Sequence, residues 1–331
     1  MNGVELLMLV AGLAMLGELL HKMNAAAVMA SISAVGWGFS LLITQELVAH
    51  VFNSLGWLYS IAPKTADKFR FGRILLMRIA GDGVNYLTPS ATLAGEWARA
   101  AMMGGEHSLD ERLSSVALAK ITQTLAMALT SVVGVVCAFS MHANFADLGP
   151  MLRHGSWLVA AIIGFIVFLE VRAGKSDKTM AGPASGSSGV WAQLKNVDHV
   201  MMSFLRLYPG RFALSVFCFL VAYLWGAFEA YWICRFLGVP VSVPTAVLIE
   251  MLAVFLDGIF FAVPGKAGTQ EATKVAIFSA LGYLPQTGLA FGIVRHIREM
   301  FWAVTGFSLY YISRIKNRIA AKPADAAQAA L

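Results

Sequence analysis

The chain has 331 residues, of which 58% are hydrophobic and 13% charged, with a formal net charge of +6. A soluble globular protein carries about 25% charged residues, so this composition excludes a soluble globular protein. It predicts an all-α polytopic membrane protein. Lys and Arg cluster between apolar runs, which is typical of membrane topology and argues against a nucleic-acid partner. The three cysteines and seven histidines are scattered, and no nucleophile–base motif such as GxSxG is present. We therefore expect no metal, cofactor, disulfide framework or catalytic residue, and we interpret His50 as interfacial.

Taken in chain order, apolar runs occur at about 4–20, 25–50, 72–88, 114–140, 156–172, 210–236, 243–263 and 286–312, with shorter amphipathic stretches at 92–104 and 268–282. Because a helical span needs roughly 20 apolar residues, these runs predict about six to eight helical elements in one transmembrane domain, residues 1–318. The first run lacks a preceding basic residue, so we interpret it as a retained span rather than a signal peptide. Three other segments complete the organisation: a polar linker (173–190), an interfacial helix (191–208) and a flexible tail (319–331).

Three basic clusters orient these runs, because cytoplasmic loops are enriched in Lys and Arg. They are Lys64, Lys68, Arg70 and Arg73; Arg172, Lys175 and Lys178; and Arg314, Lys316, Arg318 and Lys322. With all three inside, both termini are cytoplasmic. The two halves, about 1–140 and 156–318, then each contain two spans, a hairpin and a third span, in opposite orientations. Charge and hydropathy therefore predict an inverted-topology repeat.

Each half contains a polar interruption of the same design. In both, a proline follows an apolar run and a glutamate lies seven residues later, as Pro89 with Glu96 and Pro264 with Glu271. Irregular backbone at membrane depth occurs only where it is buried in protein or lines a wet cavity. We therefore predict two re-entrant helical hairpins whose tips mark an internal cavity. The alternative is an ordinary turn between two full spans.

Ionisable residues inside membrane segments are costly and usually face a bundle interior or a cavity. Here they are Arg78, Asp82, Glu96, Arg99 and Lys120 in the first half, and Glu229, Glu250, Asp257, Lys266, Glu271, Lys274, Arg295, Arg298 and Glu299 in the second. One helical turn after each hairpin acid comes a base, giving the pairs Glu96/Arg99 and Glu271/Lys274. These four residues either contact a substrate or form structural ion pairs that stabilise the short helices.

Other residues near the interruptions complete the predicted substrate-binding set. Lys266 and Gly268 lie beside the start of an amphipathic stretch, where a helix N-terminus would favour an anion. Asn85 precedes the first proline. Arg295 and Arg298, one turn apart, suit bidentate contact with a phosphate, although interfacial anchoring would explain them equally well.

Several short motifs follow one another across most of the chain: Gly36-Trp37, Leu55-Gly56-Trp57, Asn85 to Pro89, Gly95 to Arg99, Pro264 to Glu271, Leu281-Gly282-Tyr283 and Arg295 to Trp302. In their order and spacing the chain resembles the flippase-like integral membrane family related to the transmembrane region of lysylphosphatidylglycerol synthase. It is most similar to the members associated with hopanoid biosynthesis in Gram-negative bacteria. It departs from them at Ala94-Gly95, where such members often have two glycines. No soluble aminoacyl-transferase domain follows the last span in this sequence.

The resemblance implies translocation of a polar-headed lipid between the leaflets of the bacterial inner membrane, rather than an enzymatic reaction. A hopanoid-related, anionic or glycosylated lipid would be the substrate. Lipid-biosynthesis enzymes and a second copy of the chain are conceivable partners. Two alternatives stay open: an ion-coupled transporter of small solutes, and a non-catalytic membrane scaffold for lipid-modifying enzymes.

Overall fold

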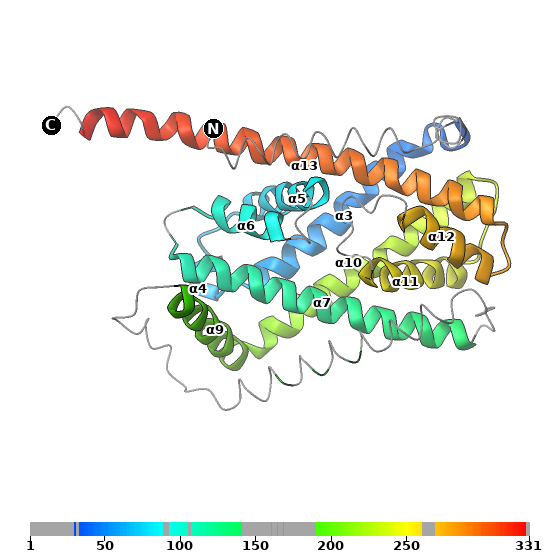
Figure 1. Cartoon of the computed structure of the whole chain (residues 1–331), viewed down its shortest axis with the longest axis horizontal. Coiled ribbons are helices and arrows are strands. Elements are labelled where there is room, and N and C mark those ends of the chain that lie inside the picture. The colour runs from blue at the N-terminus through cyan, green and yellow to red at the C-terminus, as the bar shows by residue number, and fades with distance from the viewer. Residues whose placement is uncertain are drawn as a thin grey trace.

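The computed structural model describes residues 30, 33–88, 93–104, 107–140, 160, 164, 168, 190–259 and 269–328. Within these residues every regular element is a helix (Figure 1). The helices are α3 (Gly38–Tyr59), α4 (Pro63–Ala66), α5 (Phe71–Leu87), α6 (Leu93–Met102), α7 (Leu109–Ser140), α9 (Val190–Leu207), α10 (Pro209–Phe236), α11 (Val243–Ile259), α12 (Thr269–Ala280) and α13 (Pro285–Gln328). The all-helical prediction is therefore confirmed for this part of the chain.

Helix boundaries follow the apolar runs closely where local signals are strong. Proline occupies the first turn of α4 and α10, a position where its missing N–H costs nothing. Gly238 and Gly282 follow the ends of α10 and α12 with positive φ angles of 74° and 80°, a conformation that glycine adopts without steric cost. These signals explain why α10 and α12 match the runs predicted from residues 210 and 268.

Two differences from the predicted boundaries stand out. Helix α3 begins and ends several residues later than the run 25–50. Helix α13 continues to Gln328, through most of the segment 319–331 that we expected to be a flexible tail. That segment contains several alanines, and alanine has the strongest intrinsic helix propensity.

Two stretches of the described helices are long and apolar enough to cross a membrane, Leu109–Gly134 in α7 and Pro209–Phe236 in α10. Large apolar side chains such as Val133 and Phe217 are exposed on them. Helix α11 is also apolar but carries Glu250 and Asp257. Charges on an apolar helix favour an interior position, where other groups in the protein can pair with them.

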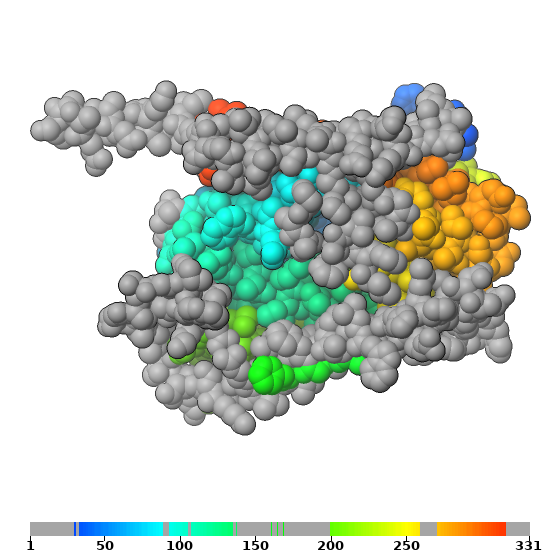
Figure 2. All heavy atoms as spheres, in the orientation of Figure 1, coloured from blue at the N-terminus to red at the C-terminus, as the bar shows by residue number. Residues whose placement is uncertain are grey.

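The helices pack in a reciprocal pattern around two antiparallel helices. Helices α3 and α10 pack against each other at the centre, with α5 and α6 at one end and α11 and α12 at the other (Figure 1). Helix α5 packs against α13, and α11 packs against α7. Each helix before an interruption therefore contacts the long helix that comes after the other pair of flanking helices. On the face drawn in Figure 2, the α6–α7 surface (cyan to teal) and the α12–α13 surface (orange) lie toward opposite ends.

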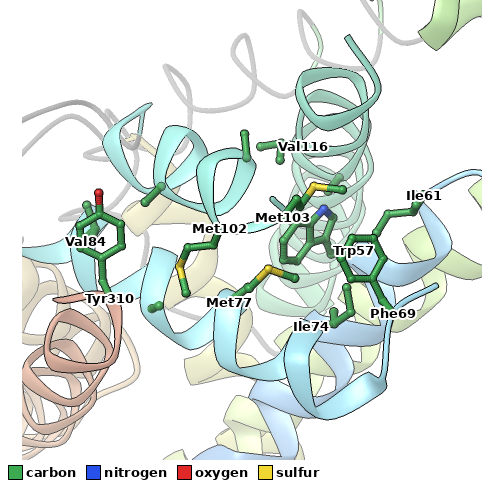
Figure 3. Packing of buried hydrophobic residues seen from close by; sticks show 14 of the residues in the cluster. Trp57, Ile61, Phe69, Ile74, Met77, Val84, Met102, Met103, Val116 and Tyr310 are labelled. Carbon is green, nitrogen blue, oxygen red and sulfur yellow. The ribbon is translucent and has the colours of Figure 1, made fainter. Parts of the chain in front are cut away.

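Close packing fixes the end that contains α5 and α6. Trp57 of α3 is fully buried, and Figure 3 shows its indole among Ile74, Met77 and Met103. Helices α5 and α13 touch at backbone level, because a Cβ added at Gly83 would lie 2.5 Å from the Phe307 nitrogen. Small residues allow such close approach between membrane helices. This packing holds the polar side chains of α5 against those of α13.

The predicted span at 4–20, residues 173–189 of the predicted linker and both interruption tips lie outside the described residues. The structure describes only the helices on either side of each tip. Those are α5 and α6 around the first and α11 and α12 around the second.

Candidate functional site

Five helices enclose a polar cavity of about 390 Å³ in the interior, here called the first cavity. Its lining comes from α3, α5, α6, α7 and α13. Four acidic and four basic side chains face it: Glu46, Asp82, Glu96 and Glu299, with Arg78, Arg99, Lys120 and Arg298. The lining charges therefore balance, although they lie inside an apolar chain.

Ion pairs organise the charges of α5, α6 and α7 around this cavity. Arg78 Nε lies 2.9 Å from Asp82 Oδ2, one turn along α5. Arg99 Nη2 lies 2.5 Å from Glu96 Oε1, which is the pair that their three-residue spacing predicts. Lys120 of α7 reaches the same Glu96 oxygen at 3.6 Å. Glu96 thus links the short helix α6 to the long helix α7.

Several hydrogen-bonding atoms of the first cavity's lining residues stay unused. Among the described residues, both ring nitrogens of His50, Nη1 of Arg78, Nε of Arg99 and the Tyr86 hydroxyl are buried without a hydrogen-bond partner. An unsatisfied buried polar group costs about 1–3 kcal/mol. Such a concentration of spare donors favours a ligand or water that supplies acceptor oxygens.

A second cavity of about 380 Å³ is enclosed by α3, α7, α10, α11 and α13. Five acidic side chains face it, but only two basic ones: Glu46, Glu229, Glu250, Asp257 and Glu299, with Arg295 and Arg298. Its lining is therefore much more acidic than that of the first cavity.

A chain of ion pairs runs along the second cavity and joins four helices. Arg298 Nη1 binds Glu46 Oε2 at 2.5 Å, and Arg298 Nε lies 2.8 Å from Glu229 Oε1. The other oxygen of Glu229 accepts a hydrogen bond from Arg295 Nε at 3.0 Å, and Arg295 Nη2 donates to Glu250. The two arginines that we expected to bind a phosphate are thus engaged with carboxylates here.

The two cavities adjoin, because five residues line both: Glu46, Asn53, Gln123, Arg298 and Glu299. These side chains come from α3, α7 and α13. Arg298 contacts acids on both sides of this shared wall, including Glu299 at 3.9 Å. A polar group that moved from one cavity to the other would therefore pass the Arg298 ion pairs.

The acid and base after the second interruption do not pair as their spacing suggests. Lys274 Nζ lies 2.8 Å from Asp257 Oδ1 of α11. Glu271 Oε1 instead lies 2.6 Å from His296 Nδ1 of α13. Both contacts join α12 to a neighbouring helix, whereas the Glu96–Arg99 pair lies within α6.

The structure brings most of the described predicted site residues to these cavities. Asn85 lines the first cavity, and its side-chain oxygen accepts a hydrogen bond of 2.6 Å from the Gly95 backbone nitrogen. Glu96 and Arg99 line the first cavity, Arg295 the second and Arg298 both. Glu271 and Lys274 line neither cavity. Pro89, Pro264, Lys266 and Gly268 lie outside the described residues.

Sequence reasoning missed the contribution of α3. Glu46, His50 and Asn53 all line the first cavity, and His50 is 7% exposed rather than interfacial. The three residues are spaced four and then three apart, which places them on one face of a helix. This polar stripe in an otherwise apolar run was the available signal.

Together these features define a helical membrane protein whose interior charges line two adjoining cavities. Residues 4–307 match the family described as the lysylphosphatidylglycerol synthase TM region, and the chain belongs to that family. Membership indicates a membrane lipid-related role of the transporter or flippase-like kind. Searches for similar curated proteins and for similar solved structures gave no match.

Proposed function

We propose that this protein moves a polar-headed lipid between the leaflets of the bacterial inner membrane. The observation that carries the proposal is the pair of adjoining polar cavities inside an apolar chain of this family. A headgroup would travel through the cavities while its hydrocarbon chains stay in lipid. In this proposal both termini are cytoplasmic, as the basic clusters predict.

The headgroup would bind first through the spare donors of the first cavity. Arg78, Arg99 and His50 each keep at least one buried nitrogen unused, and Lys120 is about 42% exposed at the cavity wall. Such donors suit phosphate or sugar oxygens. An anionic or glycosylated lipid, including a hopanoid-related one, is the substrate class that this chemistry favours.

An inverted repeat with two re-entrant hairpins would give each leaflet one cavity. Five residues of the first half recur in the second with the same spacing: Asp82, Pro89, Glu96, Arg99 and Lys120 correspond to Asp257, Pro264, Glu271, Lys274 and Arg295. The reciprocal packing of α5 on α13 and α11 on α7 fits this correspondence. Alternating access in repeat transporters arises from rocking of such halves around a central site.

A reconstituted assay tests the proposal directly. Purified protein in liposomes should accelerate the loss of a labelled anionic lipid from one leaflet, measured by quenching the label that faces outward. The variant Lys120→Gln removes one charge from the first cavity and should slow crossing by about tenfold, the equivalent of one lost charge-assisted contact. Lys68→Gln removes an exposed lysine outside both cavities and should leave crossing unchanged.

Equal rates with and without wild-type protein would contradict the proposal. A scaffold role predicts that outcome. A solute transporter would instead move a small anion across the same liposomes without moving the lipid label.

A further inference from the structure

The Glu271–His296 contact is unlike the ion pairs around the cavities. Its two side chains are 17% and 1% exposed, and they join α12 to α13. The cavity ion pairs on Arg78, Arg99, Lys120, Arg295 and Arg298 use Arg or Lys as the base. Histidine is the side chain whose ordinary pKa lies close to neutrality. Among these contacts, the Glu271–His296 pair is the one that contains a histidine.

Each member of this pair has one polar atom that forms no hydrogen bond. In the part of the chain that the structure describes, His296 Nε2 and Glu271 Oε2 are buried and have no hydrogen-bond partner. The occupied atoms, Nδ1 and Oε1, lie 2.6 Å apart. A carboxylate bonded to one ring nitrogen fixes the orientation of the imidazole ring. The free Nε2 is then a position where a proton can arrive or leave.

Neighbouring residues connect the pair to the first cavity. The Tyr86 ring of α5 meets the His296 ring edge-on, with centroids 6.2 Å apart. Tyr86 lines the first cavity together with Glu299, which lies one turn beyond His296 on α13. Protons entering the cavity in water could reach the pair along these groups.

Titratable or charged groups lie on every helix that packs against α12 or α13. They are Glu271 and Lys274 of α12, Glu250 and Asp257 of α11, Tyr86 and Asp82 of α5, Glu46 of α3, Glu229 of α10, and Arg295, Arg298 and Glu299 of α13. Both arginines are held by other carboxylates. A proton added to His296 would therefore be balanced by the carboxylate of Glu271.

We propose that Glu271 and His296 form a proton-binding site that couples proton movement to lipid crossing. This inference rests on the proposed function and names its energy source. Without the proton the pair carries one negative charge, and with it the pair is neutral. Because a buried net charge is costly, each proton gained or lost changes how α12 holds α13. The proton comes from water on one side of the membrane and returns to water on the other.

Proteoliposomes with a labelled lipid and an imposed pH gradient test the coupling. In one gradient direction, about one pH unit should speed wild-type crossing by up to ~10-fold, the limit set by the proton activity ratio. His296→Gln keeps a polar side chain but cannot titrate, so the rate of lipid crossing in this variant should not change with the pH gradient. His107→Gln is the matched control, because His107 is also buried near a carboxylate, at 4.0 Å from Glu111, but belongs to the segment between α6 and α7 and not to the α12–α13 contact. Glu271→Gln gives a second variant with the same expected loss of gradient response if His296→Gln does not fold.

A separate measurement keeps the proton site distinguishable from the transport proposal. In nanodiscs with ¹³C-labelled histidine, the signal missing from His296→Gln identifies His296, and it should shift between pH 5 and 8. A constant signal overturns the proton site, as does a gradient response in His296→Gln equal to that of wild type. Crossing that is absent from wild type overturns the proposed function, and the histidine signal then decides the proton site alone.

Discussion

The two cavities adjoin but differ in how their charged side chains are paired. The first keeps balanced charges and spare donors, whereas the second is acidic and its arginines are saturated by carboxylates. Gln123 faces the first cavity at the position where the second half has Arg298. The correspondence of Asp82 with Asp257 therefore does not make the cavities equivalent. In the proposed function, the first cavity would accept an anionic group, whereas the arginines of the second cavity are already paired with carboxylates.

In the proposed inverted repeat, single differences between equivalent positions would explain the different pairing. Asp82 has Arg78 one turn earlier, but the corresponding position before Asp257 is Ala253, so Asp257 binds Lys274 instead. The position that corresponds to His296 is Ile121, which cannot bind an acid. Glu96 pairs with Arg99 and Lys120, whereas Glu271 binds His296. The asymmetry follows from residues at matched positions rather than from a different fold.

The largest effect is expected at Glu229, which bridges both arginines of the second cavity. Its side chain is 1% exposed, and Glu229→Gln would leave two buried guanidinium groups short of one negative charge. Breaking a buried ion pair in this way costs about 3–5 kcal/mol. Thermal unfolding in detergent should show a large drop in melting temperature.

Glu111→Gln, at an exposed acid, provides the matched control and should unfold like wild type. If Glu229→Gln had the same melting temperature as the control, the chain of ion pairs would contribute little to stability. The two cavities would then differ in charge alone.

A smaller effect is expected where α5 crosses α13. Gly83→Ala places a methyl group against backbone atoms of α13, which cannot move away as a flexible side chain could. Such overpacking costs about 1–3 kcal/mol and would separate the α5 and α13 walls of the first cavity. Gly72→Ala is the control, because nothing lies within 4 Å of a Cβ at that position. Unfolding in detergent measures both, and equal stability of the two variants would argue against the backbone contact.

The sequence predicted features that depend on one helix alone, namely helix boundaries and ion pairs within a helix. Residues 72–88 and 210–236 became α5 and α10 within one residue, and the Glu96–Arg99 pair formed as its spacing predicts. Family membership was also predicted, and the match over residues 4–307 confirms it. All of these rest on local spacing or on motif order.

The partners of Glu271 and Lys274 could not be predicted in the same way. Both acid and base are on α12, but each binds a residue of another helix, His296 or Asp257. Which neighbour an interior side chain meets depends on how helices pack, and one sequence does not specify that. Glu46 was missed for the same reason, because its partner Arg298 is on α13.

The smallest effect is expected at Glu96, and it sharpens the comparison with Glu229. Glu96 also bridges two cations, but its side chain is 13% exposed and Lys120 is more exposed still. Solvent can therefore replace part of what is lost, and Glu96→Gln still offers an amide oxygen to Arg99. We expect a loss of about 1 kcal/mol, measured by the same thermal unfolding. A loss as large as that of Glu229→Gln would mean that the charges of the first cavity depend on one another as strongly as those of the second. The spare donors of the first cavity would then not be available to a headgroup.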